Sequence, residues 1–227
     1  MAKVALAEYM REKPLAARGR VGMSGPFVTV SRQYGCYGFS LGLLLREVLN
    51  EHAPPTHGWQ VYNKEILNRL ATETHLAAEL LEAERKSKPR LVVDFFRAFA
   101  PERIPSGVEI RKKVTTIVRG LAMRGHAIII GQGSAGATAD LANGLSVRLE
   151  APEDWRVSQI ALRERVSLDE ARQLIAQREQ EREYLREIYE QIFPRKPAFN
   201  LVYDCSAFTL AQIAQHVVCA MRLKGCV

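Results

Sequence analysis

The sequence predicts one α/β domain built on a doubly wound parallel sheet of about five strands, with helices layered on both faces. Short apolar runs alternate with helical patterns from Phe27 to the end of the chain. The run at residues 127–130 is apolar at every position, which is typical of a strand buried on both faces of a parallel sheet. Two glycine-rich turns follow two of the strands, and ligands bind beyond the carboxyl ends of strands in such sheets.

The expected elements alternate regularly along the chain. We expect strands at residues 27–31, 59–62, 127–130, 145–149 and 200–204. We expect helices at residues 40–50, 64–100, 106–124, 152–166, 168–192 and from 209 onward, with breaks near 72–74 and at 89. Capping signals precede four helices, at Asn63, Ser106, Ser167 and Thr209. Residues 1–24 are expected to be an N-terminal extension, and residues 25–227 a single domain.

Length and composition indicate a soluble globular protein. The chain has 227 residues, of which 47% are hydrophobic and 25% charged, enough for one large domain with a substantial core. No apolar run approaches the roughly 20 residues that span a membrane, and no signal peptide is recognisable. We therefore expect a cytoplasmic protein that does not bind a membrane.

The net charge of +7 is compatible with nucleic acid or with a small, highly charged substrate. Most basic residues are arginines spread along helical segments, without the interleaved aromatic residues of a base-stacking surface. This pattern favours a nucleotide over a nucleic acid. The four cysteines and five histidines show no spacing typical of metal ligands. Cys36 lies in the first glycine turn, where a helix N-terminus could lower its pKa, although a small residue filling a tight loop is the alternative.

The first glycine turn follows the strand at residues 27–31 and precedes an apolar helix. Strand, glycine-rich loop and helix together form a cradle for phosphate, because loop amides and the helix N-terminus point at the anion. Gly35, Gly38 and Ser40 are present, but the lysine of G-x-x-x-x-G-K-[ST] is missing. The alternative is an ordinary packing turn.

Five segments in order resemble the cytidylate kinase-like family, a branch of the P-loop nucleoside monophosphate kinases. They are residues 28–35 (VTVSRQYG), 60–67 (QVYNKEIL), 128–133 (IIIGQG), 147–156 (VRLEAPEDWR) and 200–206 (NLVYDCS). The resemblance covers most of residues 27–225. It implies a P-loop kinase-like fold with a helical acceptor-side insertion at residues 63–105 and a helical lid at residues 155–193.

The resemblance implies phosphoryl transfer from ATP, with Mg²⁺, to a nucleotide such as CMP. The residues implied to bind the ATP phosphates are Gly35, Cys36, Tyr37, Gly38, Phe39 and Ser40. The Ser40 hydroxyl could also reach Mg²⁺. Arg32 is the cation nearest to the loop, and we expect it to take over part of the work of the missing lysine. A salt bridge that orients the loop is the alternative role for Arg32.

Lid arginines clamp the phosphates in monophosphate kinases, and the resemblance implies this role for Arg163 and Arg182. Arg178 lies one turn before Arg182 on the same face of the helix, among several glutamates. A solvated helix laced with salt bridges is therefore the alternative for these arginines.

Four residues are candidates for binding the acceptor: Asn63, Lys64, Arg111 and Gln132. Two of them depart from the family, because Asn63 replaces an aspartate and Gln132 replaces the arginine of "GRG". Phe39 also stands where relatives usually have a polar or basic residue. These departures put CMP in doubt as the substrate, and catalysis as well.

Three hypotheses follow. The leading one is a cytosolic nucleotide kinase that transfers the ATP γ-phosphoryl group to a CMP-like acceptor. The second is a catalytically weak nucleotide-binding or regulatory protein that keeps the fold. The third is a kinase for another small molecule or a protein side chain. In that case the helix through Phe95, Phe96 and Phe99 and the N-terminal extension could serve partner recognition, whereas otherwise the aromatic face belongs to the core or to a homodimer surface.

Overall fold

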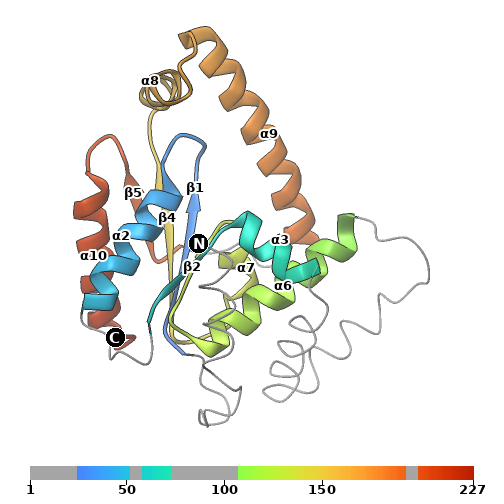
Figure 1. The fold of residues 1–227 in the computed structure, drawn as a ribbon, viewed down its shortest axis with the longest axis vertical. Helices are drawn as coiled ribbons and strands as arrows, with labels where there is room; N and C mark the ends of the chain where they lie inside the picture. Colours follow the sequence, from blue (N-terminus) through green and yellow to red (C-terminus); the bar gives the residue numbers. More distant parts are fainter. Residues whose placement is uncertain (1–24, 52–57, 73–106, 193–198) are drawn as a thin grey trace.

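The computed structural model describes residues 25–51, 58–72, 107–192 and 199–227. They form a five-stranded, all-parallel sheet in the order β2-β3-β1-β4-β5, with helices on both faces (Figure 1). The strands are β1 (Phe27–Arg32), β2 (Gln60–Tyr62), β3 (Ala127–Ile130), β4 (Gly144–Glu150) and β5 (Leu201–Asp204). The helices are α2 (Gly38–Glu51), α3 (Lys64–Thr72), α6 (Gly107–Arg124), α7 (Ser134–Ala137), α8 (Glu153–Glu164), α9 (Leu168–Ile192) and α10 (Leu210–Leu223). The predicted fold class is confirmed.

Each face of the sheet buries its own hydrophobic core. Successive side chains of a strand point to opposite faces. Val28 and Val30 of β1 accordingly join the core beneath α2 and α10, whereas Phe27 joins the core beneath α3 and α6. Figure 1 shows these two helical layers on either side of the strands. Burial from both faces explains why the β3 run is apolar throughout.

Strand β1 is the centre of the sheet. The chain leaves it for β2 and β3 on one side and then crosses to β4 and β5 on the other. The carboxyl end of β1 therefore lies at the topological switch point, where ligands bind in sheets of this kind. Because β1 and β3 are parallel neighbours, the turns that follow them leave the same edge of the sheet.

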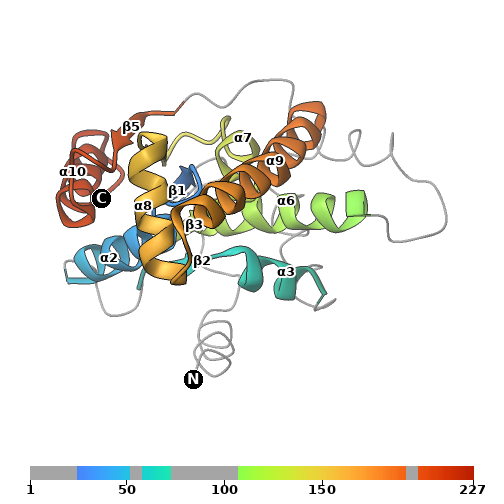
Figure 2. The ribbon, with the colours of Figure 1, turned by 90° about the horizontal axis from the view of Figure 1, so that it is seen from above.

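Helices α8 and α9 lie over this carboxyl-terminal edge (Figures 1 and 2). They pack against each other through a small apolar cluster of their own, made of Val157, Ile160, Ala171 and Ile175. Tyr34, from the loop after β1, packs against the same cluster. The two helices thus pack against each other and also against the loop that follows β1.

Local predictions are mostly confirmed. The Ser167 and Thr209 capping boxes are present, and the Asn63 side chain accepts the Ile66 N–H at 3.0 Å, which caps α3. Most boundaries differ from the prediction by one or two residues, and two of the differences lie at the glycine-rich turns. Helix α2 begins at Gly38 rather than at residue 40, and the second glycine turn runs into the short helix α7.

Several predictions lie outside the described residues: the extension at 1–24, the helix through Phe95, Phe96 and Phe99, the capping box at Ser106, and most of the 63–105 insertion. The division of the chain into domains therefore stays a prediction. Within the described part of the chain, no helix is both long enough and apolar enough to cross a membrane.

Candidate functional site

The loop after β1, residues 33–37, is called here the β1 turn. Gln33 donates its N–H to the Leu149 carbonyl at 2.9 Å, and Cys36 donates to the Gln33 carbonyl at 3.3 Å, which closes the turn. Gly35 has a φ of 98°, a conformation that glycine adopts without the strain a side chain would add. The turn delivers the chain directly to α2.

The amino end of α2 offers backbone donors above the sheet. The first bond within the helix runs from the Leu41 N–H to the Tyr37 carbonyl at 3.1 Å. The amides of Gly38, Phe39 and Ser40 precede it, so they have no acceptor inside the helix. Phe39 is an exposed side chain, and Ser40 is exposed as well. Such amides are the usual donors for an anion at a helix start.

Arg32, the last residue of β1, passes between two glycines. A Cβ on Gly38 would lie 2.9 Å from the Arg32 Cδ, and a Cβ on Gly131 would lie 2.1 Å from its Nη1. Neither glycine could therefore carry a side chain without displacing Arg32. Gly131 begins the second glycine turn, residues 131–133, called here the β3 turn. The Arg32 side chain thus lies between the start of α2 and the β3 turn.

The surroundings of Arg32 disfavour its positive charge. Burial, followed by the charge of Arg182, lowers the pKa of Arg32 to about 10; Glu179 opposes this shift and Arg148 adds to it. Burial also lowers the pKa of Arg182. When an anion binds beside desolvated guanidinium groups that repel one another, the free energy of the cluster falls.

Two arginines of the α8–α9 pair reach Tyr34 in the β1 turn. Arg163 donates from Nη2 to the Tyr34 hydroxyl at 3.3 Å, and its Cζ lies 5.6 Å from the centroid of that ring. Arg182 lies 5.3 Å from the same centroid and donates to the Arg32 carbonyl at 3.1 Å. Arg163 is itself exposed and pairs with Glu164 at 2.8 Å. Arg178 is exposed as well and pairs with Glu181 at 3.0 Å, and Tyr34 is a smaller cause of its raised pKa. Of the three arginines, Arg182 is the least exposed and donates to the Arg32 carbonyl.

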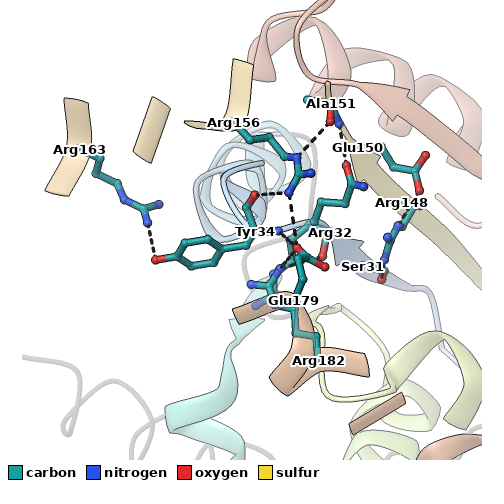
Figure 3. Close-up of polar contacts among 11 residues, drawn as sticks. Ser31, Arg32, Tyr34, Arg148, Glu150, Ala151, Arg156, Arg163, Glu179 and Arg182 are labelled. Carbon is teal, nitrogen blue, oxygen red and sulfur yellow. Dashed lines mark hydrogen bonds and ion pairs between the residues drawn. The ribbon is translucent and has the colours of Figure 1, made fainter. Parts of the chain in front are cut away.

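Arg156 and Glu179 complete the cluster (Figure 3). The Arg156 side chain is buried; its Nε donates to the Ala151 carbonyl at 3.1 Å and its Nη1 to the Tyr34 carbonyl at 3.3 Å. The Glu179 carboxylate accepts the Tyr34 N–H. It also lies 3.8 Å from Arg156 Nη1 and 3.5 Å from Arg182 Nη1. A carboxylate of α9 is therefore held against the backbone of the β1 turn.

Arg148 adds a further cation on β4. Its Nη1 donates to the Ser31 hydroxyl at 3.0 Å, its Nε pairs with Glu150 at 3.1 Å, and its Cζ lies 5.8 Å from the centroid of the Phe199 ring. Positive charge therefore extends from the β1 turn across to β4.

Cys36 contributes through packing rather than through an exposed thiol. Its side chain is buried beside that of Cys205, which follows β5. A hydrogen bond between the two thiols lowers the pKa of Cys36 and raises the pKa of Cys205. The largest cause of the lowered pKa is Cys205 rather than the helix N-terminus, and the burial of Cys36 fits a small residue that fills a tight loop.

The candidate acceptor residues are less closely grouped. Asn63 caps α3, and the neighbouring Lys64 is exposed. Gln132 lies in the β3 turn with a positive φ of 58°. Arg111 belongs to α6, in a part whose side chains lie outside the described residues. Asn63 and Gln132 follow the paired strands β2 and β3, so they share one edge of the sheet.

The residues fit a phosphate ligand better than a metal ion bound by protein alone. The donors at the β1 turn are amides and guanidinium groups, which bind anions. Among the described residues, no group of three or more His, Cys, Asp or Glu side chains could hold a metal ion. Mg²⁺ commonly takes one or two protein oxygens plus phosphates and water, and the exposed Ser40 hydroxyl is compatible with that lesser role.

Sequence reasoning missed Arg156 and Glu179 as members of the cluster. Arg156 ends the segment at residues 147–156 that resembled the family, and that position was the available signal. Glu179 had no distinguishing signal, because Glu181 and Glu183 on the same helix look alike in sequence.

A family model identifies the family of the chain, and a solved structure shares its fold. The cytidylate kinase-like family matches residues 27–207. A crystal structure of an uncharacterized protein from Eubacterium ventriosum ATCC 27560 is similar at 13% identity and a TM-score of 0.62, covering 87% of this chain and 98% of that one. The crystal structure of TT1252 from Thermus thermophilus has 16% identity, the same coverage and a TM-score of 0.41. No curated protein matches the chain.

Proposed function

Given that the chain belongs to the cytidylate kinase-like family, we propose that it transfers the γ-phosphoryl group of ATP to a nucleoside monophosphate such as CMP. The observation that carries the proposal is the convergence of Arg32, Arg163 and Arg182 on the β1 turn at the carboxyl edge of the sheet. Phosphoryl transfer needs mainly positioning and neutralisation of charge, and this cluster can supply both.

In the proposed reaction, the β1 turn and the start of α2 hold the ATP phosphates. The amides of residues 35–40 donate to the phosphate oxygens, and Arg32 supplies the positive charge that a P-loop lysine would supply. Because Arg32 also touches the β3 turn, it lies between the proposed ATP side and the proposed acceptor side. This position suits a group that neutralises the transferring phosphoryl.

The α8–α9 pair serves as the lid in this proposal, within residues 155–193. Arg163 and Arg182 clamp the phosphates, and their contacts with Tyr34 orient them toward the β1 turn. Closing the pair over the site excludes water, which strengthens each of these charge contacts. When bound, Mg²⁺ would neutralise the phosphate oxygens, and the Ser40 hydroxyl would hold it.

On the acceptor side, Lys64 and Arg111 provide cations for the monophosphate, and Gln132 provides an amide where the family has arginine. Residues 63–105 form the acceptor-side insertion in this proposal.

A catalytically weak nucleotide-binding protein is the second candidate. The observation that favours it is the neutral side chain of Asn63, which caps α3 but lacks the negative charge of the family's aspartate. Gln132 likewise removes a cation from the proposed acceptor site.

Calorimetric titration with ATP·Mg²⁺, followed by a coupled assay of ADP release over a panel of nucleoside monophosphates, separates the two candidates. Binding with turnover of one acceptor supports the kinase. Binding without turnover on any acceptor supports the second candidate, and no binding at millimolar ATP contradicts both.

Arg182→Ala and Arg178→Ala form a matched pair of variants on one helix. Arg182 is partly buried and donates to the Arg32 carbonyl, whereas Arg178 is exposed and interacts more strongly with Glu181 than with Tyr34. We expect kcat/KM to fall at least about tenfold in Arg182→Ala, because a charge-assisted phosphate contact is lost. It should stay within about twofold of wild type in Arg178→Ala. Equal effects in both variants would contradict a specific role for Arg182.

A further inference from the structure

The Glu179 carboxylate lies among groups at the β1 turn that are suited to binding an anion. Its carboxylate accepts the Tyr34 N–H of the β1 turn and lies within 4 Å of guanidinium nitrogens of Arg156 and Arg182. Its charge also acts on Arg32, whose pKa it raises against the effects of burial and Arg182. Figure 3 shows the carboxylate between these groups. Backbone N–H plus several guanidinium groups is the donor set that binds phosphate.

The arginines of this cluster have anchors besides Glu179. Arg156 is also held by the carbonyls of Ala151 and Tyr34, at 3.1 and 3.3 Å. Arg182 is held by the Arg32 carbonyl at 3.1 Å and by the Tyr34 ring. If the Glu179 carboxylate moved away, Arg156 and Arg182 would keep these other contacts and would lose only the negative charge beside them. This arrangement is what we expect if another anion can replace the Glu179 carboxylate, and not if Glu179 is needed to hold the arginines in place.

We propose that Glu179 occupies the position of a ligand phosphate in the ligand-free protein and fastens α9 to the β1 turn until phosphate displaces it. The inference rests on the proposed function, because it takes the displacing ligand to be a nucleotide phosphate. A phosphate oxygen and the Glu179 carboxylate compete for the same donors. The measured affinity is therefore lower than the intrinsic affinity by the fraction of molecules in which Glu179 is away.

Removing the charge without changing the shape tests this competition. Glu179→Gln should bind ATP and inorganic pyrophosphate at least about fivefold more tightly than wild type in calorimetric titrations. Glu181→Gln is the matched control, since Glu181 lies on the same helix and pairs with the exposed Arg178. That control should stay within about twofold of wild type. Affinity in Glu179→Gln that is unchanged, lowered, or raised no more than in the control overturns the proposal.

Glu179→Asp separates position from charge. The variant keeps the negative charge but is shorter by one methylene, so its carboxylate reaches the Tyr34 N–H less well. We expect it, too, to bind pyrophosphate more tightly than wild type. Weaker binding by both variants would identify Glu179 as a residue that positions the arginines, and would overturn its role as a competitor.

Hydrogen exchange provides a measurement that needs no ligand. The Tyr34 amide should exchange at least about tenfold faster in Glu179→Ala than in wild type or Glu181→Ala, when each ligand-free protein is followed by NMR. Equal exchange rates would overturn the fastening contact whatever the protein binds. If neither wild type nor variant binds ATP, the proposed function fails. The pyrophosphate titration still decides the inference in that case, because tighter binding by Glu179→Gln supports it and an unchanged affinity overturns it.

Discussion

The β1 turn and the β3 turn occupy similar places in the fold but have different surroundings. Both contain glycine at a positive φ, both follow buried parallel strands, and both lie at the same edge of the sheet. The β1 turn leads into the 14-residue helix α2 and is contacted by charged side chains of α8 and α9. The β3 turn has positive φ at three successive residues and leads into a four-residue helix with small buried side chains.

This difference shows that a glycine turn has two separate uses. In the β1 turn, glycine permits a backbone that exposes amides beside a long helix, where an anion is favourable. In the β3 turn, Gly131 leaves the space that the Arg32 guanidinium fills. The first turn offers donors, and the second makes room for a cation that serves the first.

Replacing Arg32, whose side chain lies between the start of α2 and the β3 turn, should have the largest effect. We expect Arg32→Met to lower ATP affinity at least about tenfold, since a guanidinium–phosphate contact is lost. The ligand-free variant should be more stable than wild type by roughly 1–3 kcal/mol, because a desolvated charge is removed while the apolar stem remains. Calorimetric titration and urea unfolding measure the two effects. A variant that is less stable and binds ATP normally would show that Arg32 is only structural.

The stability gain in Arg32→Met should depend on pH. The folded-state pKa of Arg32 is about 10, below its ordinary value of 12.5, so between these values the unfolded chain binds more protons than the folded one. The contribution of Arg32 to stability therefore becomes more favourable as pH rises through this window. We expect the advantage of Arg32→Met over wild type in urea unfolding to shrink from pH 9 to pH 11. A constant advantage would mean that Arg32 does not titrate in this range.

Gly131→Ala should displace the Arg32 guanidinium from its place against the β3 turn. The new Cβ would lie 2.1 Å from Arg32 Nη1, at a φ of 69° that side chains rarely adopt. We expect a loss of about 1–2 kcal/mol in unfolding free energy and a several-fold loss of ATP affinity. Gly136→Ala is the matched control, because nothing lies within 4 Å of its Cβ position. Its stability should stay within about 0.5 kcal/mol of wild type, and equal losses in both variants would contradict the steric argument.

The smallest effect is expected from the one non-glycine residue in each turn that has a positive φ. Gln132→Gly should stabilise the protein by up to about 1 kcal/mol, because it relieves a φ of 58°. Tyr37→Gly should destabilise it despite a φ of 36°, since the Tyr37 hydroxyl bonds to Gln159 at 3.1 Å and its ring packs edge-on against Trp155. Urea unfolding compares the two, and changes of the same sign would contradict the distinction between the turns.

Much of the fold could be predicted because the sequence signals of strands and helices come from residues close together in the chain. The apolar run of β3 and the capping residues Asn63, Ser167 and Thr209 are features of neighbouring residues, and the structure confirms them. The turn after β3 was harder, because small residues such as Ser134 and Ala135 are compatible with either a turn or a short helix.

The cluster at the site was only partly predictable. Arg32 could be selected because it adjoins the β1 turn in sequence, and Arg163 and Arg182 by resemblance to a family. Glu179 could not be selected, because its partner Tyr34 is 145 residues away and its own helix offers several similar carboxylates. Arg178 and Arg182 share a helical face in sequence, yet only the packing of α9 decides that Arg182 is partly buried beside the Arg32 carbonyl while Arg178 stays exposed.

Periodicity, capping residues and glycine positions were enough to determine the layered parallel sheet and the edge at which its two turns lie. These features act over a few residues, so the order of side chains carries them directly. The tertiary structure decided the electrostatics: it placed the Arg32 side chain between the start of α2 and the β3 turn, brought Arg156 and Arg182 to the β1 turn, and gave that turn a carboxylate from α9. Charges interact through space and burial, and neither is determined until distant segments pack together.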